Sequence, residues 1–153
     1  MSQYLNFYIK SDNKFLPLFS YSRNSAIYEY ANEYAPYDDG KIITSSIINS
    51  ILNDIKYEEE SYTPTLERIA EKKQLICQMN NSVDDKMQAI FDCNSELNEV
   101  NEIKDGLNQA RIFYEFLDDI LSNIEYDRYV TNKNEYLWFG IEWNPNYKEN
   151  EDE

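Results

Sequence analysis

The sequence predicts an α+β fold in which a small antiparallel sheet carries a short helix and a long antiparallel helical hairpin of coiled-coil type. Two segments near the chain ends, 4–19 and 136–143, have the alternation or the aromatic content of β-strands. Between them, residues 44–124 carry apolar side chains at helical spacing with one short polar break. Only three glycines and four prolines occur in 153 residues, which favours long uninterrupted elements.

The N-terminal segment is expected to be a β-hairpin. Leu5, Phe7 and Ile9 share one face of a strand, and residues 11–14 have the composition of a turn. Pro17 lies in the return strand, where it cannot donate a backbone hydrogen bond, so it indicates an edge strand or a bulge.

A short helix and a third strand complete the predicted head. The helix is expected to be capped by Ser22 or Asn24 and to end at Pro36. Residues 136–143 should pair with the N-terminal hairpin, because a lone hairpin is marginal and three strands with an apolar face are viable.

The first arm of the helical hairpin is expected to be one helix over residues 45–79. Apolar positions from Ile47 to Ile76 keep a single phase, which two independent helices would have no reason to do. Pro64 lies inside this run and should kink the helix. The alternative is a break, with Thr63 as the cap and Pro64 as the first helical residue.

The second arm is expected to run from Ser82 to about Ile124 and to change its apolar face part-way. The seam near the tip is predicted at Val83, Met87, Ile90 and Leu97, with Asn94 and Asn101 in register. From Val100 to Ile124 the apolar seam lies about half a turn away on a helical wheel. We therefore expect either a break or kink at 101–106, or a base that packs against the N-terminal unit or a second copy.

These elements predict a single domain over residues 1–148. Its head comprises 1–43 and 125–148, its helical hairpin comprises 44–124, and residues 149–153 form an acidic disordered tail. No run approaches the roughly 18 apolar residues of a membrane span, so a soluble cytoplasmic protein without a membrane partner is expected.

The charge is the strongest functional signal. The chain has 29 acidic and 14 basic residues, no histidine and a net charge of −15. Such a chain repels nucleic acid and anionic membrane and attracts basic protein surfaces.

Catalytic signatures are missing from the sequence. Without histidine there is no Ser-His-Asp triad or imidazole metal site, and no glycine-rich phosphate loop occurs. Cys77 and Cys93 are too few for a cysteine-only zinc site and are expected to be buried reduced thiols. We therefore expect no enzymatic activity, no cofactor and no direct binding of nucleic acid.

Two groups of side chains are the candidate partner-binding site. Four acidic residues with sparse lysine pairing fall on one face of the second arm. These residues, called here the acidic stripe, are Asp85, Asp92, Glu96 and Glu99. The first arm adds Tyr57, Glu58, Glu59 and Glu60. Tyrosine is enriched in interface cores, and the carboxylates could occupy a basic groove.

In size, acidity and composition the chain resembles small accessory and anti-defence proteins of phages that infect low-GC bacteria, anti-CRISPR inhibitors among them. It is rich in Asn, Ile, Lys and Tyr and poor in Arg. The resemblance implies a non-enzymatic inhibitor in the host cytoplasm. It would act as a DNA mimic that occupies the basic, nucleic-acid-binding surface of a target such as a CRISPR or other defence nuclease.

The alternative is a structural or adaptor protein. In that case the hairpin would oligomerise through the seam from Val100 to Ile124, for example as a homodimer.

Overall fold

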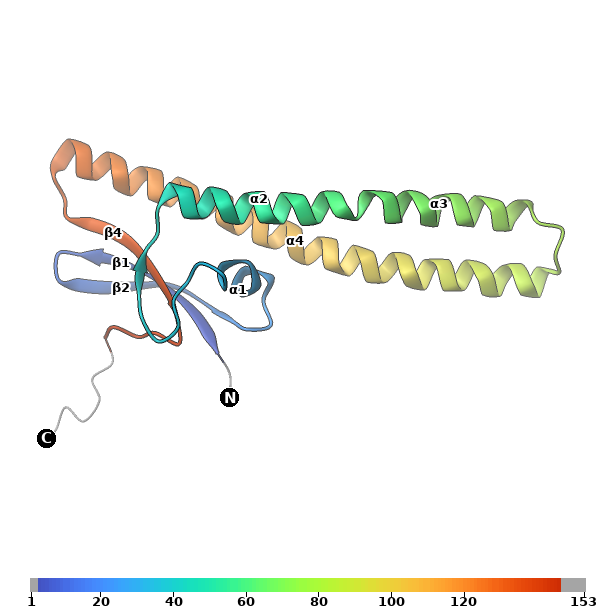
Figure 1. The fold of residues 1–153 in the computed structure, drawn as a ribbon, viewed down its shortest axis with the longest axis horizontal. Helices are drawn as coiled ribbons and strands as arrows, with labels where there is room; N and C mark the ends of the chain where they lie inside the picture. The colour runs from blue at the N-terminus through green and yellow to red at the C-terminus, as the bar shows by residue number, and fades with distance from the viewer. Residues whose placement is uncertain (1–2, 147–153) are drawn as a thin grey trace, which may run out of the picture.

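The structure, a computed structural model, describes residues 3–146 and confirms the α+β fold (Figure 1). The elements in chain order are β1 (Tyr4–Ser11), β2 (Lys14–Ser22), α1 (Ala26–Ala31), β3 (Lys41–Ile42), α2 (Ser45–Ser61), α3 (Thr63–Gln78), α4 (Val83–Thr131) and β4 (Glu135–Ile141). In Figure 1, α3 and the first half of α4 project side by side away from the sheet. The predicted tail at 149–153 lies outside the described residues.

The sheet is antiparallel, with the strand order β2-β1-β4-β3. Phe7 in the middle of β1 lies opposite Phe19 on β2 and Phe139 on β4. Pro17 lies in edge strand β2 beside a register shift, so both of its predicted consequences, an edge strand and a bulge, are confirmed. β3 is a fourth strand that the sequence did not indicate.

One face of the sheet packs against α4 to form the main core. Leu5 and Phe7 from β1 and Phe139 from β4 are completely buried there, together with Tyr114 from α4. On the far side of the sheet, the loop that precedes β3 packs closely against Gly140 of β4. A Cβ atom on Gly140 would lie 2.0 Å from a backbone oxygen of the loop that precedes β3, so no larger residue fits at this position.

The first arm consists of two helices that meet at Tyr62. Tyr62 keeps right-handed helical dihedral angles, and the proline lies in the first turn of α3, where its missing N–H is tolerated. The boundary therefore follows the alternative prediction, although Thr63 is not the cap. The predicted common phase is confirmed, because Ile48 on α2 and Ile76 on α3 are both buried.

The predicted tip seam is only partly confirmed, because Ile90 and Leu97 pack against the arm core and the other two members do not. Val83 and Met87 are 71% and 65% exposed, and Asn94 is exposed and accepts a hydrogen bond from Lys73 Nζ at 2.9 Å. Instead, the buried seam of α4 repeats every seven residues. Its members are Cys93, Val100, Leu107, Tyr114 and Leu121.

This heptad spacing explains why α4 is one continuous helix with no break at 101–106. A single face serves both halves, because a seven-residue repeat returns to nearly the same angle. The tip half of the seam packs on α3, in a second small core of Ile69, Ile76, Cys93 and Val100. The base half packs on α2 and the N-terminal unit, as one of the two alternatives predicted.

The two thiols differ in their surroundings. Cys93 is 1% exposed in the arm core, which confirms the expectation of a buried free thiol, whereas Cys77 is exposed, so the expectation is wrong there.

Candidate functional site

The acidic stripe lies on the outer surface of the projecting arm, and two of its four carboxylates have partners within the chain. Glu96 pairs with Arg68 of α3, and Asp92 accepts a hydrogen bond from Gln88 at 3.1 Å. Asp85 and Glu99 form no ion pair within the described residues. The stripe is therefore less negative than its sequence indicates.

The predicted partner-binding side chains at the end of the first arm, residues 57–60, point in different directions from α2. Glu59 turns toward α4, where its carboxylate lies 3.1 Å from Arg111 Nε, and the same guanidinium also pairs with Glu115 at 3.2 Å. Tyr57 and Glu58 turn to the other side, toward α1, and line cavities there. Glu60 is exposed and lines neither of these cavities.

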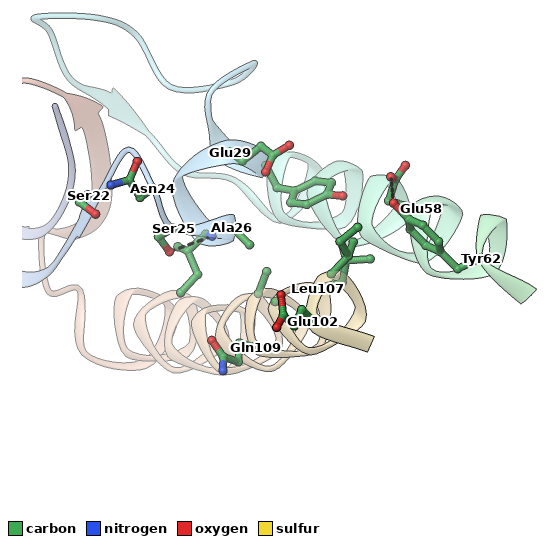
Figure 2. Close-up of a pocket in the computed structure, with 15 residues that line it drawn as sticks. Ser22, Asn24, Ser25, Ala26, Glu29, Glu58, Tyr62, Glu102, Leu107 and Gln109 are labelled. Carbon is green, nitrogen blue, oxygen red and sulfur yellow. Dashed lines mark hydrogen bonds between the residues drawn. The ribbon is translucent and has the colours of Figure 1, made fainter. Parts of the chain in front are cut away.

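A concave surface lies where α1 faces the hairpin. A cavity of about 720 Å³ opens between α1, the end of α2 and the middle of α4, and a smaller one of about 360 Å³ adjoins it. Figure 2 shows Glu29 of α1, Glu58 and Tyr62 from the end of α2, and Glu102 of α4 around the larger cavity. The two cavities share Glu29, Tyr30 and Glu58.

We call this surface the α1 groove and define it by five carboxylates and three tyrosines. Its residues are Glu29, Glu33, Asp54, Glu58, Glu102, Tyr30, Tyr57 and Tyr62. No lysine or arginine lines either cavity, and none of the five carboxylates forms an ion pair with another described residue. The groove is thus a concentration of negative charge that the described part of the chain leaves unneutralised.

The pKa values of two tyrosines in the groove are raised, in part by the neighbouring carboxylates. Burial, followed by the neighbouring carboxylates of Glu58 and Glu29, raises the pKa of Tyr30 well above its usual value. Burial and then Glu58 raise the pKa of Tyr62, whose hydroxyl donates to Glu58 at 3.4 Å. Burial and the nearby carboxylates therefore both disfavour a further negative charge at these two tyrosines.

A helix cap and a hydrogen bond to α4 hold α1 in position at one side of the groove. Ser25 caps the helix by accepting a hydrogen bond from the Ile27 N–H at 3.1 Å. The buried Tyr114 hydroxyl of α4 donates to the Ile27 carbonyl oxygen, which ties α1 to the long helix. Gly106 of α4 lies under α1, where a Cβ atom would touch only the methyl group of Ala26, at 3.9 Å.

The arrangement suits recognition of a cationic side chain. Separate carboxylates beside tyrosine rings provide charge-assisted hydrogen bonds and a cation–π surface for a guanidinium or an ammonium group. In the described part of the chain, no three acidic or cysteine side chains come together closely enough to hold a metal ion. No described helix is long and apolar enough to cross a membrane.

Comparisons with family models, with curated proteins and with solved structures find no match to this chain.

Sequence reasoning found only part of the groove. Tyr57 and Glu58 were among the candidate residues, but Glu29, Tyr30 and Glu102 were not, because α1, α2 and α4 meet only in the folded chain. The available signal was the alternation of Glu29, Tyr30, Glu33 and Tyr34, which places both acids and aromatic rings on one short helix and the turn after it.

Proposed function

We propose that this protein is a non-enzymatic inhibitor that binds a basic surface of another protein through the α1 groove. The observation that carries the proposal is the set of five carboxylates without ion pairs, beside tyrosine rings, that line two adjoining cavities of about 720 Å³ and about 360 Å³. Like charges held together destabilise a folded chain, and a cationic partner removes this repulsion. Recognition sites for small groups have volumes of this order.

The class of target follows from the charge. A protein with a net charge of −15 is steered toward positive surfaces, and the largest of these belong to proteins that bind nucleic acids. Arginine or lysine side chains of such a surface would enter the groove and be withheld from DNA or RNA. Together with the resemblance to phage anti-defence proteins, this favours a CRISPR or other defence nuclease in the host cytoplasm as the target.

A defined basic probe tests the groove. We expect a fluorescently labelled deca-arginine peptide to bind the full chain and to lose affinity as salt rises. The triple variant Glu29→Gln, Asp54→Asn, Glu58→Gln should weaken binding by about tenfold or more, since charge-assisted contacts contribute roughly 1.5–3 kcal/mol each.

The acidic stripe provides a matched control, because Asp92→Asn, Glu96→Gln, Glu99→Gln removes the same number of charges. This variant should bind the peptide within about threefold of the parent, which is less than 1 kcal/mol. Equal losses in both variants would show attraction by net charge alone, and a loss confined to the stripe variant would assign binding to the stripe. Either result rejects the groove.

Inhibition is tested on a purified CRISPR effector nuclease. The parent chain and the stripe variant should slow cleavage of DNA, and the groove variant should not. An excess of substrate DNA should relieve the inhibition, because the substrate and this protein compete for one basic surface. Inhibition that the groove variant retains would contradict the proposal.

The adaptor alternative needs a different surface from the one the sequence indicated. From Leu107 to Ile124 the seam is buried against α1, α2 and the sheet, and Leu107 and Leu121 on it are each 3% exposed. Val100 at the start of the seam is buried against α3. A second copy therefore cannot bind there without displacing the head.

A further inference from the structure

An apolar row on the projecting arm has no partner within the described residues. Val83, Met87 and Phe91 follow each other at four-residue spacing on α4, so they share one side of the helix. They are 71%, 65% and 64% exposed. We call these three residues the tip stripe. The arm core cannot use them, because its heptad seam through Cys93 and Val100 faces α3 from another side of α4.

The surroundings of the tip stripe carry few charges. The other exposed positions on this side of α4 are Asp84, Asn94 and Asn98, and only the first is ionised. One cation of α3 reaches this side, because Lys73 Nζ donates to Asn94 at 2.9 Å. Residues 63–100 carry seven acidic and four basic side chains, a net charge of −3, while the rest of the chain carries −12. Two copies of this acidic protein that meet at this end of the arm therefore keep the parts that carry most of their charge far apart.

The spacing of the tip stripe is also self-complementary. Met87 lies midway between Val83 and Phe91, so two α4 helices crossing antiparallel about a two-fold axis place Met87 against its own copy. The same arrangement places Val83 of each chain against Phe91 of the other. Apolar rows of this kind bury each other in antiparallel helical pairs.

We propose that a second copy of this chain covers the tip stripe, in a two-fold dimer that joins the arms end to end and leaves both heads free. Three side chains from each copy do not reach the roughly 1,200 Å² that stable interfaces bury, so the dimer is weak and depends on concentration. The inference is independent of the α1 groove, whose residues lie at the other end of the arm.

Sedimentation equilibrium of the full chain tests the dimer. Between about 10 μM and about 1 mM the apparent mass should rise from 18.3 kDa toward twice that value. Added salt should strengthen association, because it screens repulsion between the acidic heads. This direction is opposite to the one expected for binding of a basic partner in the groove.

Two variants of similar exposure locate the interface. Met87→Glu should abolish association, whereas Ile112→Glu, at an apolar position that is 55% exposed near the base of α4, should leave it unchanged. Far-UV circular dichroism should show that both variants keep their helices. A monomer at every concentration, or equal effects of the two variants, would overturn the proposal and favour a foreign partner for the tip stripe.

Disulfide trapping tests the two-fold geometry, in a Cys77→Ser background that removes the exposed native thiol. Met87→Cys should form a disulfide-linked dimer on mild oxidation. Phe91→Cys alone should not, because the two copies of this residue would lie about 12 Å apart along the helices, well beyond the reach of a disulfide. A mixture of Val83→Cys and Phe91→Cys chains should cross-link. Efficient linkage of Phe91→Cys to itself would contradict the antiparallel arrangement.

Discussion

Replacing Ile69 by alanine tests whether the projecting arm unfolds separately from the head. Ile69 is 1% exposed and is one of four residues in the small core between α3 and α4. The substitution deletes three carbon groups, worth about 0.8 kcal/mol each, and leaves a cavity, so the arm should lose about 3 kcal/mol. Since 1.4 kcal/mol changes an equilibrium tenfold, opening of the arm should increase by more than 100-fold.

Hydrogen exchange with mass spectrometry measures this effect segment by segment. Amides in residues 63–100 should lose protection by this factor, while those of β1 and β4 should keep theirs, because the head has a core of its own. The control is Leu75→Ala on the same helix, a 61% exposed position where the change should remain below about 0.5 kcal/mol. Equal loss of protection in arm and head would show that the two cores unfold together and would refute the reasoning.

Three further perturbations have defined outcomes. Gly140→Ala should lower the melting temperature by several degrees, because its Cβ atom would displace a backbone oxygen 2.0 Å away; an unchanged value would contradict this packing. A thiol reagent should modify Cys77 quickly and Cys93 only on unfolding, and one fast equivalent in the native protein checks this. Folding raises the pKa of Tyr30 above the ordinary 10.0, so stability present below that pH is lost as pH rises beyond it. Denaturant titrations from about pH 9 to about pH 11 should show a smaller decline for Tyr30→Phe than for the parent chain.

The fold was predictable where one residue pattern determines one element. Alternation at Leu5, Phe7 and Ile9 identified β1, and helical spacing identified the hairpin, because the side-chain periods of strands and helices differ. β3 was missed because Lys41 and Ile42 are too few to show a period and pair with β4 only in the folded chain.

The error at the tip has a simple physical cause. Val83 and Met87 were taken for the seam because they are more apolar than their neighbours, and Cys93 was treated as a thiol rather than as a small apolar side chain. A test for seven-residue periodicity over the whole of α4 would have selected Cys93 and Val100, and with them a continuous helix.

The candidate site was predictable only in its chemistry. The surplus of negative charge indicated a basic partner, but burial, ion pairing and concavity decide which carboxylates are available. Glu59 and Glu96 have cationic partners contributed by helices distant in sequence, and Glu102 lies in the groove although it is outside the four positions of the acidic stripe on α4.

Because α4 is uninterrupted, a small rotation of this helix at one end moves its other end by a larger distance. Leu107 beside the groove and Val83 at the far end are separated by about 36 Å of rigid rod, at 1.5 Å of rise per residue. A tilt of about 5° at the groove would displace the far end by about 3 Å. A small tilt of α4 at the head thus gives a displacement at the tip that a fluorophore pair on the two ends can record.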